Sequence, residues 1–146
     1  MVASRIQYAA LPYRVNPGAR TEIMLITSRE TRRWIIPKGW PQKGRAPHRS
    51  AAREAFEEAG VVGKVAKGSI GSFSYEKRLK SGDIALCNVH VFALQVQHQS
   101  ASWPEKKERQ VQWLSARRAA KTVNDPSLSN IILRMARMAG NDARSG

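Results

Sequence analysis

Residues 53–61, Arg-Glu-Ala-Phe-Glu-Glu-Ala-Gly-Val, hold three of the eleven acidic residues of a chain whose formal net charge is +14. On an α-helix, Glu54, Glu57 and Glu58 stand at i, i+3 and i+4, which places all three carboxylates on one face. Like charges at this spacing repel each other, at about 0.2–0.5 kcal/mol per i,i+4 pair. A face that weakens its own helix needs a partner, and the simplest is a hard divalent cation with oxygen ligands. The stretch therefore predicts a magnesium or manganese site.

The residues on either side of this stretch predict where its helix begins and ends. Pro47 suits the first helical turn, where the missing N–H would be unpaired in any case. Gly60 stands where a left-handed C-cap is expected after Ala59. The preceding residues 38–45, rich in Gly, Pro and Lys, predict a loop. We therefore expect a helix over residues 47–59.

The order of the other elements predicts a mixed sheet flanked by helices, of α/β or α+β class. A chain of 146 residues fits one domain, 1–146, with residues 141–146 expected to fray. Pro12 suggests that the first strand lies at an edge of the sheet or contains a bulge. We expect strands at 6–14, 22–27, 34–36, 68–79, 85–97 and 111–114, and further helices at 116–123 and 127–139.

The charge balance is the unusual feature of the composition. Twenty-five Lys and Arg residues against eleven acids suggest a polyanionic partner, such as polyphosphate, nucleic acid or an acidic membrane surface. The alternative is a generally basic surface with no dedicated ligand. No apolar run is long enough to span a membrane, and the N-terminal residues lack the apolar core of a signal peptide. The single cysteine, Cys87, excludes an internal disulfide, and together these features favour the cytoplasm.

The spacing upstream of the glutamates is more specific than the glutamates themselves. Gly39 is followed by five residues, then position 45, then seven residues, and then the stretch 53–61. This order closely resembles the signature of the Nudix hydrolases, Gly-x5-Glu-x7-Arg-Glu-U-x-Glu-Glu-x-Gly-U, where U is aliphatic or small and apolar. Every defined position matches except one, because Arg45 stands where the signature has its first Glu. The resemblance covers nearly the whole chain and implies an α/β/α sandwich with a mixed β-sheet, in which residues 39–61 form the Nudix box.

The resemblance also implies a chemistry and a set of residues for it. Nudix enzymes use divalent metal and an activated water to cleave a phosphoanhydride bond. Arg53 would orient the glutamates by charge-assisted hydrogen bonds. The implied catalytic carboxylates are Glu54, Glu58 and, from a later loop, Glu108, with Glu105 as an alternative. The implied ligands of Mg2+ or Mn2+ are Glu54, Glu57, Glu58 and the backbone carbonyl of Gly39 or Lys38.

Residues 32–40, Arg-Arg-Trp-Ile-Ile-Pro-Lys-Gly-Trp, resemble one branch of this superfamily, the diphosphoinositol polyphosphate phosphohydrolases. That branch also cleaves diadenosine polyphosphates. Its phosphate contacts correspond here to Arg29 and Arg109. Arg45 adds positive charge at the mouth of the expected site, and we expect it to contact a substrate phosphate beside Lys38 and Lys43.

Two other functions stay open from the sequence. One is removal of the 5′-triphosphate end of RNA, because a basic surface would hold the nucleic-acid backbone. The other is a catalytically weak Nudix domain that binds polyanions without turnover. The oligomeric state cannot be predicted from the sequence.

Overall fold

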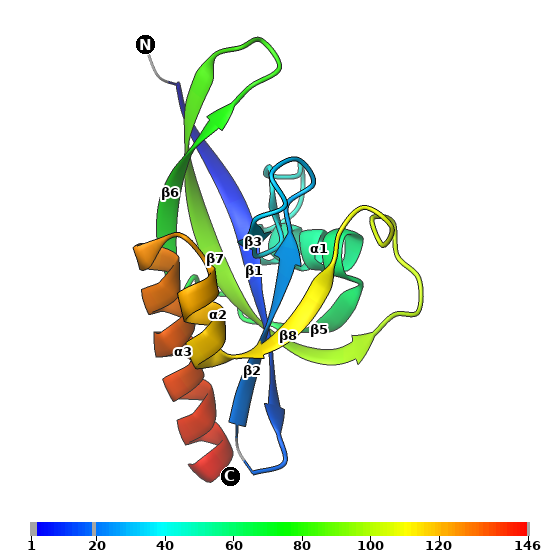
Figure 1. Ribbon diagram of the computed structural model, residues 1–146, viewed down its shortest axis with the longest axis vertical. Helices are drawn as coiled ribbons and strands as arrows, with labels where there is room; N and C mark the ends of the chain where they lie inside the picture. Colours follow the sequence, from blue (N-terminus) through cyan, green and yellow to red (C-terminus); the bar gives the residue numbers. More distant parts are fainter. Residues whose placement is uncertain (1–2, 19, 146) are drawn as a thin grey trace.

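A mixed eight-stranded sheet lies between one helix on one face and two helices on the other (Figure 1). The computed structural model describes residues 3–18 and 20–145, with side chains for 4–18 and 20–140. The strands are β1 Ala3–Asn16, β2 Arg20–Thr27, β3 Trp34–Ile35, β4 Lys38–Gly39, β5 Val61–Val65, β6 Gly71–Arg78, β7 Ile84–Gln99 and β8 Val111–Ser115. The helices are α1 Pro47–Ala59, α2 Ala116–Thr122 and α3 Pro126–Ser145. The class is α+β.

The long strands β1 and β7 pair in parallel at the middle of the sheet. The main strand order is β3-β2-β1-β7-β5, with β8 paired to β2 and β6 paired to β7. The prediction that Pro12 marks an edge or a bulge is wrong, because β1 is an interior strand. Its registered pairing passes from β4 at Tyr8 and Ala9 to β2 from Tyr13 onward. Pro12 is registered with Leu94 of β7, but on its other side it falls in the interval between β4 and β2, where no partner is registered.

Side chains that alternate along the strands build a separate core on each face. Toward α2 and α3, Leu11, Ile23 and Leu25 pack with Ile132 and Met135. Toward α1, Ala10, Met24, Ile26, Phe92 and Leu94 pack with Ala51, Ala55 and Ala59. Because α1 contributes only alanines to its core, the helix axis can lie close to the sheet.

Helix α1 begins and ends where the sequence predicts. Pro47 is its first residue, and Gly60 forms the C-cap with φ +72° and its N–H donating to the Phe56 carbonyl. A left-handed φ is readily adopted only by glycine. This helix is the element that carries the three glutamates into the site.

Several elements differ from the sequence-based expectation. The strand β5 was not predicted, because Gly63 suggests a turn, whereas it lies at a bulge in the β5–β7 pairing. The predicted loop at 38–45 begins with the two-residue strand β4. The backbone of α3 runs to Ser145, but the side chains of 141–145 and all of Gly146 lie outside the described residues, so fraying of 141–146 stays a prediction. Within the described ranges, no helix is long and apolar enough to cross a membrane.

Candidate active site

A cavity of about 690 Å3 opens between α1, β6, the β2–β3 loop and the turn between α2 and α3. Acidic side chains from α1 and from the loop after β7 reach it, as do cationic side chains from the β2–β3 loop, β4, β6 and the loop after β7. Elements that are far apart in the sequence therefore meet at this one place. We describe it below as the cleft.

The carboxyl groups that α1 contributes to the cleft are buried to different extents. Glu58 is only 4% exposed, and Glu54 is half-buried. Burial, with the neighbouring Glu54 carboxyl, raises the pKa of Glu58 to about 9. Burial also raises the pKa of Glu54, with Glu57 and Glu105 adding to the rise. Glu54 and Glu58 are neighbours, and each resists ionisation. Both can be charged together only if a cation lies close to them.

The glycine that begins the Nudix box lies directly against one of these groups. A Cβ added to Gly39 would lie 2.3 Å from Oε1 of Glu54, so the Glu54 carboxylate would have to move from this position. The Gly39 backbone and the Glu54 carboxylate can therefore approach each other only because residue 39 has no side chain. Gln42 donates a long hydrogen bond of 3.4 Å to the same Glu54 oxygen.

The third glutamate of α1 is paired within the helix. Nε of Arg53 donates to Oε1 of Glu57 at 2.8 Å, one helical turn away. Among residues 4–18 and 20–140, whose side chains are described, no three acidic, His or Cys side chains converge as a ready-made metal site. The donor set nevertheless fits a divalent cation, because it offers hard carboxylate oxygens beside a bare glycine backbone. The Arg53 contact is to Oε1 of Glu57, so the second carboxylate oxygen can serve as a ligand while Arg53 stays in place.

Arg109 connects the β7–β8 loop to the buried Glu58. Its Nη2 lies 3.6 Å from Oε1 of Glu58, and its Nε lies 2.9 Å from Oε1 of Glu105. Its Nη1 donates to the Thr27 carbonyl at 3.0 Å, which ties it to the end of β2. The Arg109 side chain is 9% exposed, so its positive charge is poorly screened and opposes the rise in the pKa of Glu58.

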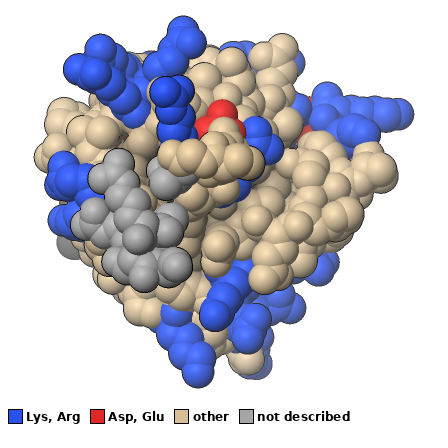
Figure 2. All heavy atoms as spheres, turned by 90° about the horizontal axis from the view of Figure 1, so that it is seen from below, with Lys and Arg blue, Asp and Glu red and all other residues tan. Residues whose placement is uncertain are grey.

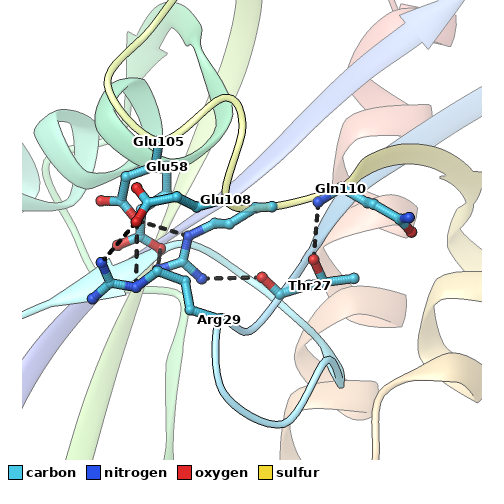
Figure 3. Close-up of polar contacts among 7 residues, drawn as sticks. Thr27, Arg29, Glu58, Glu105, Glu108 and Gln110 are labelled. Carbon is cyan, nitrogen blue, oxygen red and sulfur yellow. Dashed lines mark hydrogen bonds and ion pairs between the residues drawn. The ribbon is translucent and has the colours of Figure 1, made fainter.

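Arg29 bridges the β2–β3 loop, in which it lies, and the β7–β8 loop at the mouth of the cleft. Its Nε lies 3.8 Å from Oε1 of Glu105, and its Nη1 lies 3.6 Å from Oε1 of Glu108. The Arg29 side chain is 56% exposed, so these pairs add little stability and can exchange partners at low cost. Figure 3 shows Arg29, Glu105 and Glu108 lying together with Glu58.

Lys38 places a cation on the wall of the cleft below β6. Its Nζ lies 4.9 Å from the centre of the Tyr75 ring, whose hydroxyl donates to Oε1 of Gln7 at 2.7 Å. Burial lowers the pKa of Lys38, while the negative charge of Glu58 acts in the opposite direction. The aromatic face and the nearby carboxyl group both favour the charged form in this buried position.

The predicted substrate-binding residues divide into two groups in the structure. Arg29, Lys38 and Arg109 line the cleft. Lys43 and Arg45 are exposed on the loop before α1 and do not line it, so their contact with substrate stays a prediction. The cleft also contains cations that the sequence did not assign to it: Arg33, Lys77 and Arg78. The pair at 77–78 was visible as a basic cluster, but only the pairing of β6 with β7 brings it to the cleft.

Residues 7–135 match the family model described as the NUDIX domain. The chain therefore belongs to the Nudix family. It is a Nudix hydrolase, a pyrophosphohydrolase. The order of residues in the Nudix box and the position of α1 agree with this class.

Two relatives and one solved structure illustrate the range of similarity. Nudix hydrolase 16, mitochondrial, of Arabidopsis thaliana is 27% identical over 142 residues, which cover 89% of this chain and 78% of the relative. Diphosphoinositol polyphosphate phosphohydrolase 3-beta of Bos taurus is 30% identical over 105 residues, covering 70% and 60%. The chain spans only between 50% and 64% of the length of several other plant relatives. The crystal structure of the C. elegans Ap4A hydrolase matches the fold with a TM-score of 0.65 at 17% identity, over 94% of this chain and 98% of that one.

Proposed function

We propose that this chain hydrolyses a phosphoanhydride bond in a highly phosphorylated substrate, such as a diadenosine polyphosphate or a diphosphoinositol polyphosphate. The observation that carries the proposal is that one cleft holds both the buried carboxyl groups of α1 and a wall of cations. Phosphoanhydride cleavage needs positive charge on the phosphate chain and acceptors for a water proton. The cleft offers both kinds of group within one cavity.

Glu54, Glu57, Glu58 and the Gly39 carbonyl would hold Mg2+ or Mn2+ on the α1 side of the cleft. When bound, the ion would neutralise charge on the phosphate chain and make water a better nucleophile. Its charge would also allow Glu54 and Glu58 to be ionised together, which burial opposes in the free chain. Arg53 would hold the remaining glutamate, Glu57, in reach.

The cationic side chains would bind the phosphate chain itself. Arg29 and Arg109 are held in the free chain by Glu105 and Glu108. A phosphate oxygen offers the same charge-assisted contacts, so binding would exchange one anionic partner for another. This exchange would release the carboxylate of Glu108, which is then free to accept a proton from water, with Glu54 and Glu58 as the other candidate bases.

The number of cations favours a long phosphate chain over a substrate with two phosphates. A diphosphate offers fewer anionic oxygens and less negative charge to these cations than a longer phosphate chain does. The name of the bovine relative, which specifies a diphosphoinositol polyphosphate, agrees with such a substrate class. The cations that line the cleft are Arg29, Arg33, Lys38, Lys77, Arg78 and Arg109.

A substrate panel tests the proposal. Purified protein with Mg2+ or Mn2+ would be incubated with diadenosine tetraphosphate, a diphosphoinositol polyphosphate, nucleoside triphosphates and an ADP-linked sugar, with the products resolved by chromatography. We expect the first two to be cleaved with kcat/KM well above the ADP-sugar, and Glu58→Gln to remove the activity. Cleavage of the ADP-sugar alone would contradict the polyphosphate assignment. No product from any substrate would favour a domain that only binds polyanions.

The distribution of basic residues favours RNA with a 5′-triphosphate as a second candidate. Figure 2 shows Lys and Arg in separate groups around one whole face of the molecule, with few acidic atoms between them. Arg117, Lys121 and Arg137 lie in a hollow between α2 and α3, away from the residues that line the cleft. A nucleic-acid backbone could use such remote cations, and its binding would weaken steeply with salt. Pyrophosphate release from triphosphorylated RNA, faster than from ATP, would support this substrate.

A further inference from the structure

The β7–β8 loop, residues 100–110, has no regular secondary structure, yet it delivers Glu105 and Arg109 to the cleft. A loop with no strand or helix of its own needs an anchor if it is to hold charged side chains at fixed distances. The structure places that anchor at the C-terminal end of α1.

The last turn of α1 receives hydrogen bonds from this loop and from the end of β7. Helix ends leave carbonyl groups without intrahelical partners. Here the amide of Glu105 donates to the Glu57 carbonyl at 3.0 Å, and the amide of Ser100 donates to the Gly60 carbonyl at 2.8 Å. The side chain of Gln99 donates to the Ala59 carbonyl at 2.7 Å. The helix end and the loop therefore form one hydrogen-bonded unit.

Between these bonds, the indole ring of Trp103 lies on the backbone of Gly60. A Cβ at residue 60 would lie 2.2 Å from Cε3 and 2.3 Å from Cδ2 of Trp103. Gly60 is thus required twice, for its left-handed φ and for the space that the ring occupies. Nζ of Lys106 lies 5.3 Å from the ring centre on the same loop. The Trp103 Nε1 atom is buried without a hydrogen-bond partner among the described residues, so the ring is held by packing rather than by its polar atom.

We infer that Trp103 is a positioning residue for the active site, acting through its seat on Gly60. From this seat the chain turns through Glu105, whose amide is fixed on Glu57, to Arg109, whose guanidinium lies beside Glu58. The ring sets the distance between the loop and α1, and hence between Arg109 and the carboxyl groups of the helix. Trp103 does not line the cleft, so its effect on turnover is indirect.

The Nε–H of Arg109 gives a direct readout that does not depend on knowing the substrate. It donates to Glu105 in a nearly buried position, so its 15N–1H NMR signal should be resolved from those of exposed arginines. The Arg109→Lys variant, which lacks this group, assigns the signal. The expected effect on turnover rests on the proposed function. The expected position of the Arg109 side chain does not.

The test compares Trp103→Ala, Trp103→Phe and a control, Met135→Ala, which truncates a buried α3 side chain in the other core. We expect Trp103→Ala to move the Arg109 signal to the region of exposed arginines and to lower kcat by about 10- to 100-fold. Trp103→Phe keeps a ring on Gly60, so it should retain the signal near its original position and most of kcat. Met135→Ala should lose stability with the signal unmoved.

Three results would overturn the inference. The first is a folded Trp103→Ala protein with the Arg109 signal at its original position. The second is an equal loss of signal and kcat in Trp103→Phe, and the third is an equal displacement in Met135→Ala. If Trp103→Ala does not fold, Trp103→Leu takes its place with the same expected displacement. If the wild-type protein cleaves no substrate, the signal alone decides, so failure of the proposed function is separated from failure of this inference.

Discussion

Helices α1 and α3 cover opposite faces of the same sheet and bury different kinds of side chain. Helix α3 packs Leu128, Ile131, Ile132 and Met135 into its core, whereas α1 packs only alanines into the other. Helix α1 also buries Glu58, and this burial raises the pKa of its carboxyl group to about 9. Large apolar side chains stabilise one face, while small ones on the other allow a charged helix to lie close to the sheet.

The difference teaches that the large apolar side chains and the buried carboxyl group are carried by helices on opposite faces of one sheet, although the cleft also reaches Leu128 of α3. A buried carboxyl group without a cation costs free energy, so α1 is a weak contributor to the fold by itself. The core beneath α3 can offset this cost. Substitutions on the two helices should therefore separate activity from stability.

The largest effect is expected for Glu58→Gln on α1. Removing this carboxylate should lower kcat by about 10²- to 10³-fold, because an electrostatic contact to the reacting groups is lost. The free energy of unfolding of the metal-free protein should stay equal or rise, since a buried acidic group is replaced by a neutral one. Steady-state kinetics and urea unfolding measure the two effects. Retention of full activity would show that the assignment of Glu58 is wrong.

The opposite pattern is expected for Ile132→Ala on α3. Ile132 is fully buried, and its truncation should lower the free energy of unfolding by about 2–5 kcal/mol. At a temperature where the variant is folded, kcat should stay within about twofold of wild type, because Ile132 does not line the cleft. A loss of kcat as large as that of Glu58→Gln would mean that the two faces are not separate.

Ala55→Leu should affect both properties at once. Ala55 is fully buried between α1 and the sheet, so added atoms must move the helix outward at a cost of about 1–3 kcal/mol. The same movement displaces Glu54 and Glu58 relative to Gly39, so kcat should fall as well. Ala52→Leu, at a half-buried position three residues earlier in the helix, is the matched control. Equal behaviour of the two variants would contradict the close packing proposed for α1.

The pH dependence of stability should report the buried carboxyl of Glu58. Burial raises its pKa to about 9 in the folded chain from the 4.5 of an exposed glutamate, so the folded state binds more protons between these limits. Stability of the metal-free protein should therefore fall as pH rises through this window. Thermal unfolding at about pH 6 and about pH 8.5 measures it, with Glu58→Gln expected to flatten the profile. A wild-type profile no steeper than that of Glu58→Gln would contradict the shift.

The smallest effect is expected for Arg45→Glu, which restores the residue that the Nudix signature has at this position. Arg45 is exposed, so the free energy of unfolding should change by no more than about 0.5 kcal/mol. If Arg45 contacts a substrate phosphate, KM should rise, since one attractive charge becomes repulsive. Lys67→Glu, on the exposed turn after β5, controls for the change in net charge. An unchanged KM for the true substrate would rule out the contact.

The sequence predicts the acidic helix well because local signals define it. Pro47 and Gly60 fix its ends, and the spacing of the glutamates fixes their common face. The strand at 61–65 escapes prediction because Gly63 interrupts its pattern, and the glycine is explained only by β7, whose Gln95 carbonyl would lie 1.9 Å from an added Cβ. Long-range pairing decides that element, and one sequence does not contain it.

The cleft is predictable only in part for the same reason. The residues of the Nudix box are close in sequence, and Gly39 with Glu54 meet as expected. The contact between Glu58 and Arg109 joins positions 51 residues apart (109 − 58), and the contact between Gly60 and Trp103 joins the end of α1 to the β7–β8 loop. No periodicity or spacing predicts either contact, since both depend on how the β7–β8 loop folds back on α1.

The most direct test of the α1 assignment is a titration with Mn2+ followed by electron paramagnetic resonance, in which bound ion loses the sharp signal of free ion. Wild-type protein should remove free Mn2+ at a stoichiometry of at least about one ion per chain, and Mg2+ should compete. Glu57→Gln and Glu58→Gln should weaken binding by at least about tenfold, while Met135→Ala should bind as wild type does. Equal Mn2+ affinity in wild type, Glu57→Gln and Glu58→Gln would contradict the assignment of the acidic face of α1 as the metal site.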